Sequence, residues 1–253
     1  QVVLQNYMFE RFIDRLSQSY YSDKFILKGG MLIAAIVGID NRSTMGMDIT
    51  IKNYPINVEM ISKAIHEICA IAIDDNVYFS FSGIESIRDG DVYGGYRVTI
   101  ISEYDGIKTP MQIDITTGDR ITPKEVFYQY KMNFKEGSIH VWSYNIETIL
   151  AEKVETILRR GELNTRPRDF YDVYILTKTQ FFDHSVFIEA LRTTASHREA
   201  THIFNNIVNR LDEICVSEDL RNRWLKYTND YRYAVGITYE DVIDSIRKLT
   251  QSL

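Results

Sequence analysis

Two segments of alternating polarity each carry an aspartate on their polar side. Asp48 lies in residues 45–52 (MGMDITIK), and Asp114 lies in residues 108–116 (KTPMQIDIT). Strict alternation is typical of a half-buried strand, whose second face is free to carry chemistry. If the two strands are neighbours, their carboxylates form a site for Mg²⁺, a hard cation that takes oxygen ligands and substrate phosphates. Each aspartate taken alone is more simply a solvated strand residue.

A glycine pair, Gly29 and Gly30, stands directly before an apolar, helix-like run. Glycines at the start of a helix leave backbone N–H groups bare for an anion. A phosphate cradle close to a carboxylate that binds metal is the combination that nucleotidyl transfer needs. Neither the glycine pair nor either aspartate is a specific motif by itself.

Lys153 lies on the apolar face of a strongly periodic segment, residues 146–160, seven residues after Ile146. Lysine avoids inward faces because an ammonium group without a partner is costly to desolvate. One interpretation is snorkelling, in which the stem is buried and the charge reaches water at the edge. The other is a ligand phosphate as partner, if the helix lines a cleft.

Asp169 and Asp172 are three residues apart in a predicted helix that runs from residue 168 to about residue 178, so they share one face. Asp169 is close enough to the helix N-terminus to complement the helix dipole, which is a common structural role. Asp172 lies deeper in an aromatic-rich segment, and the dipole does not explain it.

These residues fall in two regions that differ in their predicted secondary structure. The first mixes predicted helices with strands and carries both alternating segments, and from Asn145 onward the patterns are helical only. The pattern predicts an α+β protein with a mixed-sheet domain over residues 1–142 and an all-helical domain over residues 143–253. Further segments predicted as helices are 4–20, 57–72, 187–192, 199–215, 217–230 and 239–249; further predicted strands are 77–84 and 96–102.

Composition narrows the function classes. The 253 residues have 45% hydrophobic content, 25% charged content and a net charge of −6, which argues against a protein that coats nucleic acid by bulk electrostatics. An RNA partner would have to bind a local patch, for which the arginines at 159, 160, 166 and 168 are candidates, although a solvated turn explains them equally well. Two distant cysteines and the absence of a long apolar run predict a cytoplasmic protein that does not enter the membrane.

Four sequence segments, in this order, carry a family resemblance: LKGGM…RSTMGMD, MQIDITTGDRITP, ETILAEKVETI and NTRPRDFYDVYIL, within residues 25–178. Together they resemble the AbiEii family of nucleotidyltransferase toxins, the toxin halves of type IV toxin–antitoxin systems that act in abortive infection, a phage defence. The resemblance implies a nucleotidyltransferase domain of the DNA polymerase β type followed by a helical domain.

The resemblance also implies roles for particular residues. Gly29, Gly30 and Thr44 would bind the phosphates of an NTP, Asp48 and Asp114 would bind Mg²⁺, Lys153 would contact the triphosphate, and Asp169 with Asp172 would form the last acidic motif. The implied reaction is Mg²⁺-dependent transfer of nucleotides from an NTP to a tRNA 3′ end, which blocks translation. The implied partner is a cognate antitoxin, a DNA-binding repressor that in type IV systems acts without a stable complex.

Gly46 departs from the family pattern, whose strand reads Asp-x-Asp and would place its first aspartate there. Glycine offers no oxygen to a metal, so a two-metal reaction, in which cations clamp both the attacking and the leaving oxygens, is poorly served. Gly46 is a silencing substitution or a natural degenerate copy. The alternatives to an active RNA-modifying enzyme are a catalytically inactive nucleotide- or RNA-binding module, and nucleotidyl transfer to a protein.

Overall fold

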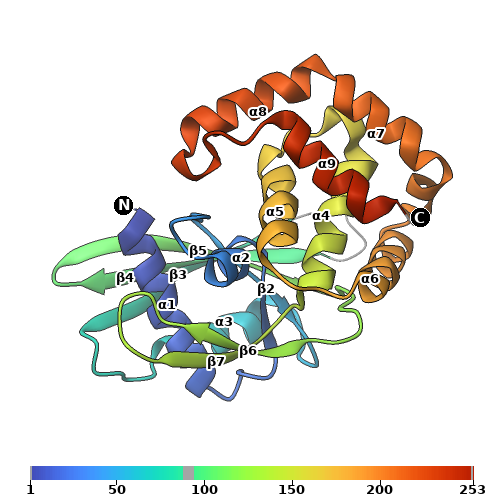
Figure 1. The fold of residues 1–253 in the computed structure, drawn as a ribbon. Coiled ribbons are helices and arrows are strands. Elements are labelled where there is room, and N and C mark those ends of the chain that lie inside the picture. The colour runs from blue at the N-terminus through green and yellow to red at the C-terminus, as the bar shows by residue number, and fades with distance from the viewer. Residues whose placement is uncertain (1, 88–93, 252) are drawn as a thin grey trace. The chain divides into compact units, whose positions relative to one another are not determined.

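The computed structural model describes residues 2–87, 94–251 and 253. The chain forms two compact units: residues 1–119 with 125–144, and residues 120–124 with 145–253. The first unit contains the sheet and the second is helical (Figure 1). The predicted α+β class is therefore confirmed.

The first unit is built on a seven-stranded mixed sheet in the order β3-β4-β5-β2-β1-β7-β6. Strand β2 pairs in parallel with β5, and β1 with β7, whereas the other neighbours are antiparallel. The strands are β1 (Phe25–Lys28), β2 (Met47–Ile51), β3 (Val77–Ile87), β4 (Gly95–Tyr104), β5 (Ile107–Thr117), β6 (Val126–Lys131) and β7 (Ser138–Ser143).

The β6–β7 hairpin was not predicted from the sequence. Its polarity alternation is blurred because the aromatic Phe127 is 60% exposed on the polar side, stacked on His140 and close to Trp142. A period-2 pattern indicates a strand only where the outward side chains are polar. The alternating segments around Asp48 and Asp114 meet that condition, and both are strands.

Helices α1 (Val2–Gln18) and α3 (Val58–Cys69) lie against one face of the sheet, while α2 (Gly29–Val37) follows β1 directly (Figure 1). The apolar side chains of β2 and β5 that alternate with the two aspartates are buried in this core: Met47, Ile49, Ile51, Met111, Ile113 and Ile115. The opposite, polar face of these strands is the face that carries Asp48 and Asp114.

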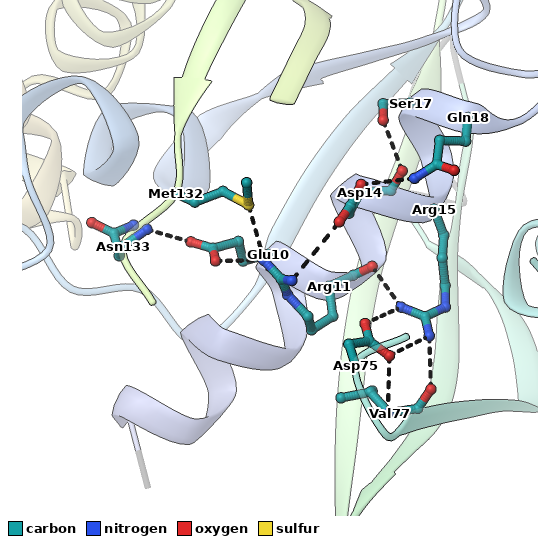
Figure 2. Close-up of polar contacts among 10 residues, drawn as sticks. All are labelled: Glu10, Arg11, Asp14, Arg15, Ser17, Gln18, Asp75, Val77, Met132 and Asn133. Carbon is teal, nitrogen blue, oxygen red and sulfur yellow. Dashed lines mark hydrogen bonds and ion pairs between the residues drawn. The ribbon is translucent and has the colours of Figure 1, made fainter. Parts of the chain in front are cut away.

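Helix α1 also carries buried charges (Figure 2). The Arg15 guanidinium donates to both carboxylate oxygens of Asp75, at 2.8 and 2.9 Å, and to the Val77 carbonyl at 2.7 Å. On the same helix Glu10 accepts from Arg11 at 2.7 Å and from the Asn133 backbone N–H at 2.6 Å. These bonds tie α1 to the start of β3 and to the loop after β6.

The second unit begins at Asn145, whose side chain accepts from the Thr148 N–H at 2.7 Å and caps α4. Helix α4 ends at Gly161, which has φ +53°, so both predicted ends of this helix are confirmed. The helical elements are α4 (Ile146–Arg160), η1 (Gly161–Leu163), α5 (Pro167–Thr179), α6 (His184–His197), η2 (Thr201–Asn206), α7 (Ile207–Val216), α8 (Glu218–Asp230), η3 (Arg232–Ala234) and α9 (Tyr239–Thr250).

The single helix predicted over residues 199–215 is wrong, because it divides into η2 and α7. The η2 sequence, THIFNN, combines threonine with two asparagines, whose side chains favour caps and turns over helix interiors. Within the part of the chain that the structure describes, no helix has the length and apolar character needed to span a bilayer.

Replacing Arg15 with methionine tests the buried network. The change leaves Asp75, whose side chain is 5% exposed, without its ionic partner. Breaking a buried pair in this way costs about 3–5 kcal/mol, so we expect Arg15→Met to lower the free energy of unfolding by this amount in urea titrations. Lys108→Met removes the exposed Lys108–Glu103 pair and should change little. A similar small loss in both variants would contradict this role of Arg15.

The same ion pair gives a pH dependence. Burial raises the pKa of Asp75, but hydrogen bonds from Arg15 and the Val77 N–H outweigh it and hold the pKa below its ordinary value. A carboxylate with a depressed folded-state pKa stabilises the protein above its unfolded pKa of about 3.9, and this stabilisation is lost as pH falls toward the folded-state value. We expect Asp75→Asn to flatten the loss of stability measured by chemical denaturation as pH is lowered below about 4.

Candidate active site

Asp48 on β2 and Asp114 on β5 are register partners in the parallel pair. Partners in register point to the same face of a sheet. Both aspartates are partly exposed, and the adjacent apolar residues of their strands are buried. The structure therefore brings together the two carboxylates that the sequence predicts as metal ligands.

The glycine pair Gly29 and Gly30, called the glycine turn from here on, lies directly against Asp48. Gly29 starts α2 with φ +64°, and a Cβ added to it would lie 2.1 Å from Asp48 Oδ2. The Gly30 N–H donates to Asp48 Oδ2 at 3.4 Å, and a Cβ on Gly30 would lie 2.9 Å from Thr44 Oγ1. Only glycine permits this approach of the helix start to the strand. Gly29, Gly30, Thr44 and Asp48 thus form one group.

Thr44 and Gly46 form the turn that leads into β2. The buried Thr44 hydroxyl donates to the Gly46 carbonyl at 3.1 Å and accepts from the Gly46 N–H at 3.5 Å. A Cβ added to Gly46 would meet nothing within 4 Å, and Gly46 is not among the residues with positive φ. Packing therefore does not require glycine at this position.

A cation stands on each side of the two carboxylates in the sheet register. Lys28 on β1 is the partner of Asp48, and Arg97 on β4 is the partner of Asp114. Arg97 Nε donates to Asp114 Oδ1 at 2.8 Å and Nη2 donates to Oδ2 at 2.9 Å. These bonds and the charge of Asp114 raise the pKa of Arg97.

Arg97 was missed in the sequence analysis, although a signal was present. It alternates with the buried Val98 on a predicted strand, which puts it on the polar face. The neighbour of its strand and the register between them depend on tertiary structure, so the pairing of Arg97 with Asp114 could not be predicted from the sequence.

Lys28 forms a second, more buried ion pair that the sequence analysis also missed. Its ammonium group pairs with Asp119, which accepts from Thr116 Oγ1 at 2.8 Å. Burial by itself raises the pKa of Asp119, but the Lys28 charge and the hydrogen bonds lower it well below its usual range. Asp119 lies in the segment MQIDITTGDRITP, five residues after Asp114. This pair fixes the end of β1 and therefore the start of the glycine turn.

Lys153 on α4 belongs to the second unit and has carboxylate partners there. Its Nζ lies 2.5 Å from Asp169 Oδ1 and 3.0 Å from Asp172 Oδ2, both on α5. The Lys153 side chain is 20% exposed, Asp169 7% and Asp172 0%. The aspartates share a face as predicted, and the Lys153 charge is paired with them, so simple snorkelling does not describe it.

The donor set of the first unit fits one Mg²⁺. This cation is usually held by one or two carboxylates together with substrate phosphates, and Asp48 with Asp114 supplies the carboxylates. Over residues 2–87, 94–251 and 253 there is no group of three or more His, Cys, Asp or Glu side chains able to hold a metal ion. Two cations would need further ligands, which is consistent with Gly46 in place of an aspartate.

The mixed sheet, the glycine turn beside a carboxylate and the helical second unit define a nucleotidyltransferase fold, and solved structures share it. MenT4, a nucleotidyltransferase toxin from Mycobacterium tuberculosis H37Rv, is similar with a TM-score of 0.57 at 13% identity, over 98% of this chain and 93% of that one. A protein from H. pylori classed as a nucleotidyltransferase gives 0.51 at 15% identity, over 99% and 95%. No curated protein gives a significant match to the sequence.

The family model described as nucleotidyl transferase AbiEii toxin, type IV TA system, matches residues 11–245. The chain therefore belongs to the AbiEii family, the nucleotidyltransferase toxins of type IV toxin–antitoxin systems. The match spans both units and includes the two strands with their aspartates and the helices α4 and α5.

Gly29→Ala tests the close approach of the turn to Asp48. Its methyl group would collide with Asp48 Oδ2 at a position of positive φ, so both crowding and backbone strain oppose it. We expect a loss of about 1–3 kcal/mol in the free energy of unfolding, measured by denaturant titration. Gly46→Ala is the matched control, because its methyl group meets open space. Equal stability of the two variants would show that the approach is not tight.

Proposed function

We propose that this chain transfers a nucleotide from an NTP to an RNA acceptor, the 3′ end of a tRNA, and thereby blocks translation. The observation that carries the proposal is the register of Asp48 beside Asp114, next to the glycine turn. Family membership supplies the reaction class, and the acceptor comes from the resemblance described above. The protein is expected to act in the cytoplasm, where NTPs and tRNA are present.

The glycine turn is proposed to bind the nucleotide phosphates. The first backbone N–H groups of α2 have no partner within the helix, and the positive end of the helix dipole favours an anion. Gly29 and Gly30 have no side chains of their own to cover these groups, and the one bond of the Gly30 N–H, to Asp48, is long at 3.4 Å. Thr44 holds the adjacent turn against Gly46 and Gly30.

Asp48 and Asp114 are proposed to hold Mg²⁺ together with the phosphates. When bound, the cation neutralises charge on the phosphates during transfer. The acceptor hydroxyl oxygen bonds to the α-phosphorus, and the bond from that phosphorus to the bridging oxygen breaks to release pyrophosphate. Asp48 and Asp114 would hold the cation, which would supply charge neutralisation, and the proton of the acceptor hydroxyl would leave to solvent water.

Lys153 is the residue proposed to contact the negatively charged triphosphate. Two carboxylates, Asp169 and Asp172, hold its ammonium group in one place and offset its charge, so a triphosphate would have to replace one of them as its partner. In this proposal the two aspartates are positioning residues and Lys153 contacts the substrate.

Gly46 weakens this enzyme in the proposal, because a one-cation site clamps only part of the reacting group. It also favours the second candidate function, an inactive module that binds a nucleotide or RNA without transfer. A third candidate keeps the transfer reaction and changes the acceptor to a protein. The expected partner is an antitoxin, a DNA-binding repressor that counteracts the toxin without a stable complex.

Restoring the missing carboxylate tests the proposal directly. The chain is incubated with each α-labelled NTP, Mg²⁺ and total RNA, alongside the variants Gly46→Asp and Gly46→Ala. We expect label on tRNA, increased at least about tenfold in Gly46→Asp, because an added metal ligand stabilises the transition state. Gly46→Ala adds a side chain without an oxygen and should match the unaltered chain.

The outcomes separate the three candidates. Label on RNA from the unaltered chain excludes the inactive module. If the unaltered chain and Gly46→Asp both leave RNA unlabelled, the tRNA proposal fails. Label that enters protein when cell extract replaces RNA would support the protein acceptor, and nucleotide binding without any labelling would support the binding module.

A further inference from the structure

Arg97 occupies the carboxylate that the proposed metal needs. Its guanidinium uses two donors on the two oxygens of Asp114, at 2.8 and 2.9 Å, which is the fork geometry of a strong charge-assisted pair. Asp48, the other carboxylate, instead accepts a long 3.4 Å bond from the Gly30 backbone N–H. The two halves of the proposed metal site therefore differ, because a side-chain cation already compensates Asp114.

We propose that Arg97 is a built-in competitor of the divalent cation at Asp114 and sets the metal affinity of this site. The guanidinium and a divalent cation would both bind the carboxylate oxygens of Asp114, and their positive charges repel each other. Arg97 thus acts through Asp114 as a positioning residue, without being a ligand itself. The inference rests on the proposed function, in which Asp48 and Asp114 bind Mg²⁺.

The competition follows from the charges that surround the site. Across the sheet register the order is Lys28, Asp48, Asp114, Arg97, Glu85. Glu85 also acts on the Arg97 charge, but the two hydrogen bonds of Arg97 go to Asp114. Lys28 is paired with Asp119, so its charge is already offset, whereas Arg97 directs its charge at Asp114 itself. Gly46 supplies no further carboxylate, so Asp114 is one of only two side-chain ligands in the proposed site. Competition at Asp114 therefore affects half of these ligands.

The alternative is an ordinary cross-strand pair. Opposite charges on neighbouring strands stabilise a sheet modestly, and Arg97 and Asp114 are register partners on β4 and β5. In that case removal of Arg97 would lower the melting temperature and leave metal affinity unchanged. Metal affinity therefore separates the two interpretations, and stability alone does not.

The experiment measures Mn²⁺ binding to the full-length chain without nucleotide, by the loss of the free Mn²⁺ signal in electron paramagnetic resonance. We expect Arg97→Gln to bind Mn²⁺ about fivefold more tightly than the unaltered chain, near the upper end for a partly exposed ion pair. Arg97→Lys keeps the charge and should stay close to the unaltered chain, so it also reports on folding of the β4–β5 pair.

Arg247→Gln is the matched control. Arg247 has a comparable exposure, 40% against 36%, and forms one ion pair, with Asp212 in the helical unit. It removes the same charge from the protein and should leave Mn²⁺ affinity unchanged. Asp48→Asn and Asp114→Asn identify the site, because each should weaken binding.

Each outcome decides between the possibilities. Unchanged or weaker binding by Arg97→Gln, with binding still dependent on Asp48 and Asp114, overturns the competition and leaves the proposed metal site intact. Tightening by Arg97→Lys equal to that of Arg97→Gln assigns the competition to the two-donor fork, which lysine lacks, and overturns the role of the charge. Binding that ignores Asp48→Asn and Asp114→Asn, or no binding by any variant, overturns both the competition and the metal site.

Discussion

The parallel pairing of β2 with β5 sets two carboxylates, Asp48 and Asp114, beside each other on one face of the sheet. Two neighbouring negative charges repel each other unless positive groups lie close to them. The surroundings supply these groups: the Arg97 guanidinium on one side and the start of α2, with the Gly30 N–H, on the other. The strand order places the two carboxylates side by side, and the glycine turn and the flanking cations lie next to them.

Buried ion pairs join elements within each of the two units. Lys28 with Asp119 fixes the end of β1, Lys153 with Asp169 and Asp172 joins α4 to α5, and Arg15 with Asp75 ties α1 to β3. Such pairs are expensive to desolvate and contribute little net stability compared with apolar residues of the same size. Their value here is geometric, because each fixes the position of one element relative to another.

Gly46 lies beside the candidate site, but the fold does not depend on glycine at this position. Nothing in the packing requires glycine there, and Thr44 holds the turn through backbone atoms that any residue has. The fold can therefore take a residue with a Cβ atom at this position without a clash of that atom. Because glycine supplies no metal ligand there, a nucleotide- or RNA-binding module is the main alternative to the proposed transferase.

The sequence by itself determined the α+β class, the two strands with their aspartates, the glycine turn and the helix α4 with both of its ends. These are local properties, since polarity period, N-cap and glycine each act within a few residues. Tertiary structure alone decided that β2 lies beside β5 in the register that joins Asp48 to Asp114, that Arg97 faces Asp114, and that Lys153 has carboxylate partners. Strand pairing and register come from contacts between distant residues, and a slip of one residue would turn every side chain to the opposite face.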